Sequence, residues 1–368
     1  MNRGTQPDSG RKTAWEDNGT MQTATTRRSA LLAGFGATLA APWVARAQGQ
    51  YRPEYKMSVV GNRPIPFAEG AFIWADLVTQ RSGGRINVKV YPGSQLVGGD
   101  QTRELLAMRQ GVIDFAVLST INIAPQVREA SLFQLPFLMP DHRALDALIG
   151  GEVGAELFKV VERREVVPLS WGENGFREIS NSKRPLRTPG DLRGLKVRFA
   201  AGNIFKDIYE ALGANPVQMS FADLQPALST GAVDGQENPI NLFLAFRMDT
   251  LAQKHLTVWN YVNDPLVFAL SKQVWSSFNP ADQQLVRECA EEAGKQQIAL
   301  TRKGLGVPGT DRASLEELRK RGVEVTMLSA EEKRAFAAAT KSVYDKWAGT
   351  VGADLVRKAE AAVRSAAA

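Results

Sequence analysis

Hydrophobic and polar positions follow two different periods along the chain. Strict alternation over 86–90 predicts a strand, and apolar residues at helical spacing over 72–78 predict a helix before it. Residues 102–109 read as another helix, and residues 112–118 read as a buried strand. This succession of helices and strands predicts an α/β fold with a mostly parallel sheet.

Three segments carry the signature of a helix N-terminus. Thr188, Ser220 and Ser329 each place a hydroxyl where it can accept an early backbone N–H, and an acidic residue follows three positions later. Alternation predicts short strands at 196–199 and at 323–327. The second half of the chain therefore continues the α/β pattern.

Longer apolar stripes mark the remaining helices. Residues 282–300 read as one helix, with Cys289 on its apolar stripe, so we expect a packed core thiol rather than a reactive one. Apolar positions over 336–347 predict a C-terminal helix. The segment 131–139, which contains Pro136 and is followed by a second proline, predicts an irregular crossing segment.

The first 47 residues read as an export signal. An apolar run over 30–41 directly follows Arg27-Arg28, and it is shorter than the roughly 20 residues that cross a bilayer. Ala45-Arg46-Ala47 has the small-x-small pattern of a signal peptidase site. The paired arginines favour the twin-arginine route over general secretion, and the polar, acidic stretch before Met21 favours Met21 as the true start. The alternative interpretation is a short buried helix with flanking charges.

Composition narrows the classes of function. The 368 residues are long enough for two domains, and 44% hydrophobic with 23% charged residues is typical of a globular protein. The net charge is +6, of which +3 lies in the first 47 residues, so the mature chain is too weakly basic for a general nucleic-acid binder. One cysteine and two histidines exclude an internal disulfide and argue against metal clusters. We expect no cofactor, no metal and no nucleic-acid partner.

One motif raises an enzymatic alternative. Ser180 and Lys183 have the S-x-x-K spacing of serine acyl enzymes, in which the lysine helps to activate the serine. The companion motifs Ser-Asp-Asn and Lys-Thr-Gly do not follow, and Pro185 opposes the helix that should carry the pair. An exported serine acyl enzyme is therefore an alternative function, which covalent labelling of Ser180 by an acylating probe would reveal.

A basic segment gives a sharper signal. Residues 183–198 hold six cations and one acid, and most of these cations are expected to form a solvated surface. Arg198 differs because it lies in the apolar strand 197–199, where a guanidinium is costly unless it meets an anion. Its paired donors fit both oxygens of a carboxylate. Arg177, which follows Phe176, is a second candidate for such a clamp.

Five segments together resemble the substrate-binding proteins of TRAP transporters, the DctP family. The strings Val-Asp-Gly-Gln-Glu-Asn-Pro, Leu-Gly-Ala-Asn-Pro and Gly-Leu-Lys-Val-Arg lie at 233–239, 212–216 and 194–198. Tyr-Pro-Gly-Ser-Gln-Leu at 91–96 and Gly-Val-Ile-Asp-Phe at 111–115 match the N-terminal half of the family. The likeness covers essentially the whole mature chain in the expected order.

The resemblance implies a two-lobed periplasmic-binding-protein (Venus-flytrap) fold with crossing segments and a hinge. We expect lobe I to span 48–174 plus 264–303 and lobe II to span 175–263 plus 304–368. The implied function is a periplasmic, non-enzymatic protein that captures an organic acid, such as a sugar acid, a C4-dicarboxylate or a keto acid. It would deliver this ligand to the small and large membrane subunits of a TRAP transporter. A sensory binding protein that serves a receptor is an alternative.

The resemblance also implies a set of substrate-binding residues: Arg198, Arg177, Asn238, Phe221, Asn62, Ser119 and Trp171. In the family, the arginine equivalent to Arg198 pairs with the ligand carboxylate. Arg177 then adds a second contact, and Asn238 hydrogen-bonds to the same carboxylate.

The other implied contacts come from both lobes. Phe221 resembles an aromatic residue that packs on the ligand, and Asn62 lies in a loop that supplies polar contacts from lobe I. Ser119 stands where sialate-binding members carry a glutamate, which argues against sialate as the ligand. Gln236 and Glu237 are expected to support their loop rather than touch the ligand.

Overall fold

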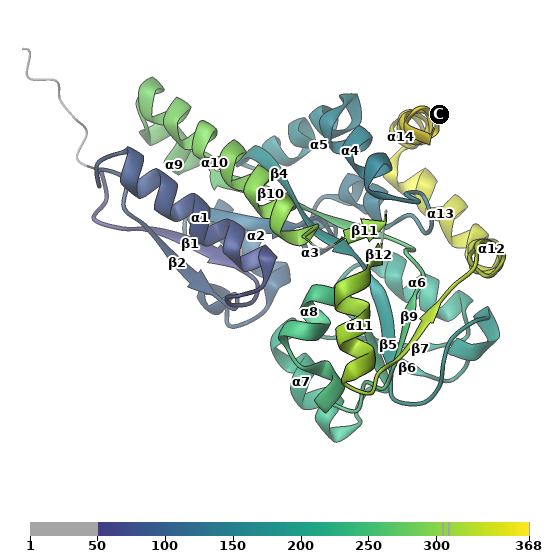
Figure 1. Cartoon of the computed structure of the whole chain (residues 1–368). Helices are drawn as coiled ribbons and strands as arrows, with labels where there is room; N and C mark the ends of the chain where they lie inside the picture. Colours follow the sequence, from purple (N-terminus) through teal and green to yellow (C-terminus); the bar gives the residue numbers. More distant parts are fainter. Residues whose placement is uncertain (1–50, 304, 308–309, 368) are drawn as a thin grey trace, which may run out of the picture. The chain divides into compact units, whose positions relative to one another are not determined.

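The computed structural model describes residues 51–367 except residues 304, 308 and 309. The predicted export signal, residues 1–47, lies outside the described residues. Residues from 50 onward group into one unit, which contains two β-sheets and the helices around them (Figure 1).

Five strands form the first sheet, in the order β2-β1-β3-β10-β4. Strand β1 pairs in parallel with β2 and β3, whereas β10 runs antiparallel to both of its neighbours. The strands are β1 (Tyr55–Val59), β2 (Val88–Pro92), β3 (Phe115–Ser119), β4 (Val166–Phe176) and β10 (Asn263–Ser271).

Six strands form the second sheet, in the order β13-β9-β5-β8-β6-β7. Strand β5 runs antiparallel to β8 and β9, and the other pairs are parallel. The strands are β5 (Glu178–Asn181), β6 (Lys196–Phe199), β7 (Asn215–Gln218), β8 (Gly235–Asn238), β9 (His255–Val258) and β13 (Glu324–Met327). Two short strands, β11 (Leu305–Val307) and β12 (Thr310–Asp311), pair with each other.

The α/β class is confirmed. Nine of the eleven strands described in the two sheets run in the same direction within their sheet, as expected of mostly parallel sheets, and β10 and β5 are the two antiparallel exceptions. Only Arg177 separates β4 from β5, and residues 259–262 separate β9 from β10, so the chain passes between the sheets twice there. The parallel strands of each sheet direct their carboxyl ends towards this boundary. Strands β5 and β10 each follow one of these crossings, so they begin at the boundary and run away from it. They are therefore antiparallel to their neighbours.

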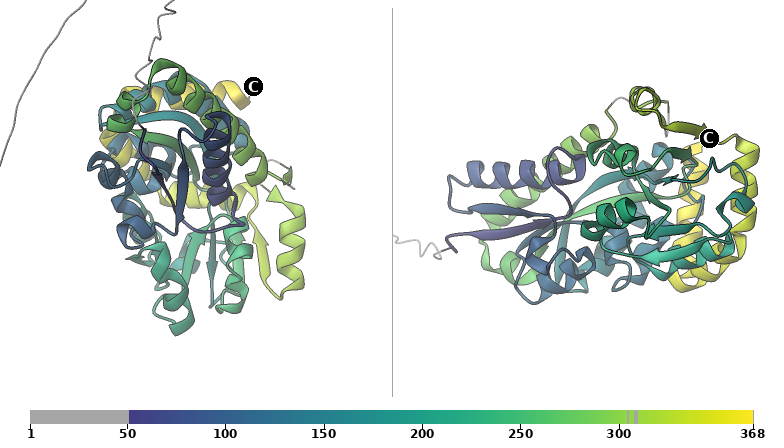
Figure 2. Two further views of the ribbon diagram at one scale, coloured as in Figure 1. Left: turned by 90° about the vertical axis from the view of Figure 1, so that its left-hand side faces the viewer. Right: turned by 90° about the horizontal axis from the view of Figure 1, so that it is seen from below.

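The first sheet is covered on both faces. Helices α1 (Pro66–Arg81) and α10 (Pro280–Thr301) lie side by side on one face (Figures 1 and 2). Phe115 and Val117 of β3 join their core, while Ala116 and Leu118 face a second core with helices from the other side. Burial on both faces explains why the four consecutive residues 115–118 of β3 are all apolar.

Several helices complete the other face of the first sheet and the segment that follows β3. Leucine, methionine and valine side chains of α2 and α5 contribute to the second core. The elements are α2 (Glu104–Arg109), α3 (Thr120–Ile123), η3 (Arg128–Gln134), α4 (His142–Gly150) and α5 (Glu152–Glu162). Helix α9 (Lys272–Ser277) instead joins the core that contains α1 and α10, through Val274.

The second sheet also lies between two cores. One core contains α6, α12, α13 and α14 together with α4 and α5. The last helix, α14, is yellow in Figures 1 and 2 and contacts α4 and α5. The other core contains α7, α8 and α11. The helices are α6 (Asn203–Ala211), α7 (Phe221–Thr230), α8 (Ile240–Ala245), α11 (Arg312–Lys320), α12 (Ala330–Ala339), α13 (Lys341–Val351) and α14 (Ala353–Ala367).

The predicted local signals are mostly confirmed. Ser220 and Ser329 cap α7 and α12 through their hydroxyls, and Thr188 forms a capping box at the 3₁₀ helix η4 (Pro189–Leu192). The expected single helix over 336–347 is two helices. Its break lies at Thr340, whose hydroxyl donates to the carbonyl of Phe336 at 2.9 Å and so bonds back to the preceding turn.

We predict that the thiol of Cys289 is protected in the native protein. Cys289 is fully buried between α10 and the first sheet, and burial raises the pKa of its thiol. Reaction with a thiol reagent should therefore require the native structure to open around Cys289, at a free-energy cost of several kcal/mol. The reaction should be roughly 1,000-fold slower than in the unfolded chain. Because the chain has one cysteine, timed labelling followed by mass spectrometry measures this directly. Labelling at similar rates in buffer and in denaturant would contradict the packing.

Candidate functional site

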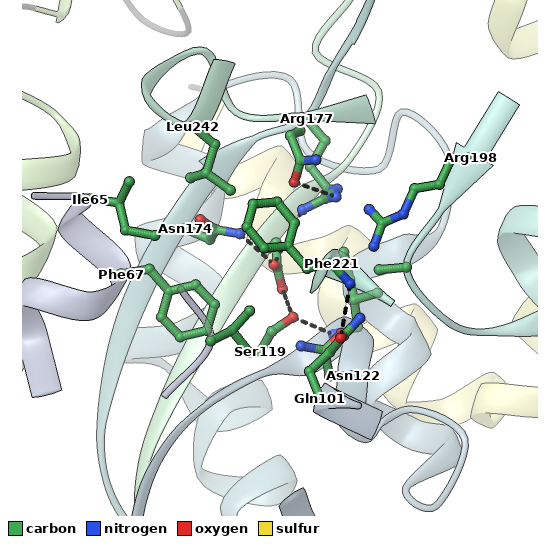
Figure 3. Close-up of a pocket in the computed structure, with 15 residues that line it drawn as sticks. Ile65, Phe67, Gln101, Ser119, Asn122, Asn174, Arg177, Arg198, Phe221 and Leu242 are labelled. Carbon is green, nitrogen blue, oxygen red and sulfur yellow. Dashed lines mark hydrogen bonds and ion pairs between the residues drawn. The ribbon is translucent and has the colours of Figure 1, made fainter. Parts of the chain in front are cut away.

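A pocket lies where the carboxyl ends of parallel strands from both sheets meet (Figure 3). Val60 follows β1 and Ser119 ends β3 in the first sheet, while Ala200 follows β6 and Asn238 ends β8 in the second sheet. In open α/β sheets this is the edge at which small ligands bind. Both sheets thus contribute residues to one candidate site.

Strand alternation directs Arg198 into this pocket. Val197 and Phe199 are buried in the core with α6, so the side chain between them lies on the opposite face of the sheet. Arg198 is 1% exposed, and its Nε and Nη2 donate to the carbonyl of Met219 at 3.0 and 2.8 Å. Its Nη1 has no hydrogen-bond partner among the described residues, and no described carboxylate forms an ion pair with it.

The Arg198 guanidinium carries an unbalanced positive charge. Its pKa is lowered to about 10, chiefly by burial and also by the nearby Arg177, while Glu237 acts in the opposite direction. The side chain is therefore still protonated at neutral pH. A buried cation without a paired anion is costly, so this position favours a negatively charged ligand.

Arg177, in contrast, is engaged by the protein itself. Its Nε and Nη2 both donate to the carboxylate of Glu237, and Nη2 also donates to the side-chain oxygen of Asn238 at 3.0 Å. Its Nη1 lies 3.5 Å from the carboxylate of Asp264. Burial alone would lower the pKa of Arg177, but Glu237 and Asp264 raise it above its usual value. Arg177 lines the pocket, yet its charge is already balanced by two carboxylates.

The Gln-Glu-Asn string of β8 forms a hydrogen-bonded support. Asn238 lines the pocket, donates to the side chain of Gln236 at 2.5 Å, and accepts from Arg177. Gln236 in turn donates to Ser180, and Glu237 accepts from Tyr261 at 3.2 Å. Gln236 and Glu237 do not line the pocket, and their supporting role stays a prediction.

A cluster of polar residues from the first sheet faces the same pocket. Asp264 of β10 accepts from Ser119, Thr120 and Asn174 at 2.7, 3.2 and 2.9 Å. The pairing of β4 with β10 shifts register between Asp264 and Pro265, which leaves Asn174 as the additional residue of a β-bulge. Bulges redirect side chains, and this one brings Asn174 against Asp264.

Phe221 and Asn62 lie at the rim between the two sets of elements. Phe221 begins α7, lines the pocket, and packs edge-on against Phe246 with ring centroids 4.9 Å apart. Its backbone N–H donates to the side chain of Gln101 at 3.1 Å, which links the start of α7 to the segment before α2. Asn62 lines an adjacent pocket with Phe221, and it does not share the lining of the pocket that contains Arg198.

Trp171 is placed away from the other candidates. Its ring stacks on Phe158 at 4.5 Å and meets Phe133 edge-on at 5.7 Å, and it does not line the pocket.

Two residues that line the pocket, Asp264 and Asn174, were not predicted from the sequence. Both are buried polar residues at one end of a strand whose other end is largely apolar, which is the sequence signal that could have identified them.

The S-x-x-K motif does not assemble a serine–lysine pair. Ser180 is fully buried in β5, where its hydroxyl donates to Gln253 and accepts from Gln236, both at 2.8 Å. Lys183 is half-exposed and pairs with Asp234 at 3.3 Å.

Across residues 51–367, outside the three gaps, no group of three or more His, Cys, Asp or Glu side chains is arranged to hold a metal ion.

The model of bacterial extracellular solute-binding proteins, family 7 (DctP), matches residues 58–350. The chain belongs to the DctP family. The family comprises solute-binding proteins of transporters and is not a class of enzymes. None of the described helices of this DctP protein has the length and apolar character needed to cross a membrane.

Three relatives illustrate the similarity. The C4-dicarboxylate-binding periplasmic protein DctP of Rhodobacter capsulatus is 32% identical over 309 residues, which cover 83% of this chain and 90% of that protein. A TRAP periplasmic solute-binding protein from Ralstonia eutropha H16, solved with bound (S)-2-acetolactate, is 56% identical, with a TM-score of 0.84 and coverage of 86% and 100%. Another, from Sulfurospirillum deleyianum with bound succinate, is 27% identical, with a TM-score of 0.77 and coverage of 84% and 98%. The two-lobed fold and the family's binding of organic acids are thereby confirmed.

The different surroundings of the two arginines predict different effects on stability. Arg177→Met should lower the free energy of unfolding by about 3–5 kcal/mol, because Glu237 would be left buried without its cation. Arg198→Met should change it by less than about 1 kcal/mol or raise it, because the lost charge has no internal anionic partner. Urea unfolding of both variants without ligand measures the contrast. Equal losses would contradict the assignment of their partners.

Proposed function

We propose that this chain captures a small organic acid in the pocket between the two sheets and delivers it to the two membrane subunits of a TRAP transporter. The observation that carries the proposal is the buried guanidinium of Arg198, which has a free donor and no ion pair among the described residues. A ligand carboxylate supplies both the missing hydrogen-bond acceptor and the missing charge. Binding and release make and break no covalent bond.

The remaining contacts follow from the pocket lining. Asn238 of the second sheet and Arg177 at the crossing between the sheets would support the carboxylate. Phe221 would pack against the carbon skeleton, and Ser119 would contribute from the first sheet. Asn62 would act from the adjacent rim. The structure supports no ligand contact for Trp171, whose ring is held between other aromatic residues.

The ligand we propose is a short-chain acid such as 2-acetolactate. The supporting relative is the Ralstonia eutropha protein, which is 56% identical and was solved with that acid. Ile65, Phe67, Ile121 and Leu242 line the pocket, and such apolar side chains suit a short, branched skeleton better than a polyhydroxylated sugar acid.

Ligand binding would be coupled to a change in the angle between the lobes proposed at 48–174 plus 264–303 and at 175–263 plus 304–368. A ligand that touches both lobes favours the closed state only by its differential affinity for it, and a shift from mostly open to mostly closed takes about 5 kcal/mol. One bidentate charged contact and several sheltered hydrogen bonds, at roughly 1.5–3 kcal/mol for each charged one, are sufficient. The permease would then recognise the closed form.

Export is part of the proposal. Residues 1–47 would direct the chain to the periplasm by the twin-arginine route and be removed before Gln48. Mass spectrometry of the periplasmic protein would locate the cleavage site.

Removal of the guanidinium should abolish ligand binding. A thermal-shift screen of organic acids first identifies a ligand, and calorimetry then compares the variants. Arg198→Met should weaken binding by at least about 100-fold, since a charge-assisted pair is lost, and Arg198→Lys should recover only part of the affinity because an ammonium lacks the paired donors. Arg187→Met is the matched control, since Arg187 is exposed and pairs with Glu332. Unchanged affinity in Arg198→Met would refute the proposed clamp.

A further inference from the structure

Asp264 places a second charge in the pocket, opposite in sign to Arg198. Its carboxylate is 1% exposed and belongs to β10 of the first sheet, whereas Arg198 belongs to β6 of the second sheet. Both residues line the same pocket. A ligand that spans the pocket would therefore meet a cation at one end and an anion at the other.

Polar side chains around Asp264 donate hydrogen bonds to its carboxylate. Ser119 and Thr120 donate to its Oδ1, and Asn174 donates to its Oδ2. Because the amide nitrogen of Asn174 must face the carboxylate, its oxygen points elsewhere. This oxygen is buried and has no hydrogen-bond partner in the described part of the chain. Figure 3 shows Asn174 and Ser119 across the pocket from Arg198. The first-sheet side thus presents acceptor oxygens, which suit a hydroxyl donor on the ligand.

The four charged groups of the site sum to zero before any ligand binds, but both carboxylates pair with Arg177 and neither forms an ion pair with Arg198. Arg177 and Arg198 are the cations that line the pocket in the described structure, and Glu237 and Asp264 are the nearest anions. A ligand with one carboxylate adds one negative charge beside Arg198. A second carboxylate on the ligand would lie close to the carboxylate of Asp264. The nearby Arg177 cannot offset this added charge, because it already pairs with Glu237 and Asp264. The two buried negative charges would therefore repel each other strongly.

We propose that Asp264 makes this site selective for acids with a single carboxylate and a hydroxyl group, and that it discriminates against dicarboxylates. The inference rests on the proposed function, in which Arg198 binds the carboxylate. Asp264 acts by direct repulsion of a second anion, and Asn174 completes the site by accepting from the ligand hydroxyl.

Three acids with one carbon skeleton test the selectivity by calorimetry at pH 7.5. 2-Hydroxyisovalerate has one carboxylate and one hydroxyl, isovalerate lacks the hydroxyl, and 3-methylmalate replaces one methyl of 2-hydroxyisovalerate by a second carboxylate. The native protein should bind 2-hydroxyisovalerate at least about tenfold more tightly than either of the others. This comparison needs no variant and so does not depend on the folding of one.

Asp264→Asn assigns the effect to the charge. The affinity for 3-methylmalate relative to 2-hydroxyisovalerate should rise at least about tenfold in this variant. Asp114→Asn is the matched control, because Asp114 is also a buried carboxylate next to β3 but pairs with Arg52 and does not line the pocket. The ratio should not change in the control.

The outcomes separate this inference from the proposed function. A dicarboxylate as the tightest ligand of the native protein, with binding lost in Arg198→Met, would overturn the role of Asp264 and leave the proposed function intact. An unchanged ratio in Asp264→Asn would do the same. Failure of the native protein to bind any acid of the panel would instead overturn the proposed function.

Discussion

The binding site depends on one buried charge that the protein does not pair with an anion. The guanidinium of Arg198 is held by the carbonyl of Met219 and retains a donor with no partner in the described structure. Folding removes this cation from water, which costs free energy. The electrostatic attraction that offsets this cost forms only when an anion binds. The pocket is therefore built for a negatively charged ligand before any ligand is present.

Two arginines that look alike in the sequence have different roles in the structure. Each lies beside an aromatic residue in or next to a strand, and each lines the pocket. Arg177 is saturated by Glu237, Asn238 and the nearby Asp264, and it joins the crossing point of the chain to the second sheet. Arg198 lacks such partners among the described residues. The partner of each side chain, rather than its sequence context, decides which of the two can receive a ligand.

The sequence predicted those features that depend on local pattern. Alternation correctly predicted the strand 196–199, and the caps at Ser220 and Ser329 marked real helix starts. It did not predict features that depend on the pairing of distant strands. The antiparallel β5 and β10 follow from the two crossings, and the bulge that brings Asn174 to Asp264 is a matter of register between strands some ninety residues apart. No local pattern encodes that register.

The most direct measurement of the central claim is a crystal structure of the complex with an organic acid identified by screening. The account predicts that a carboxylate oxygen of the ligand lies within hydrogen-bond distance of Nη1 of Arg198, with the rest of the ligand directed towards Asn174. A complex in which the carboxylate lies elsewhere and Nη1 still has no anionic neighbour would contradict it.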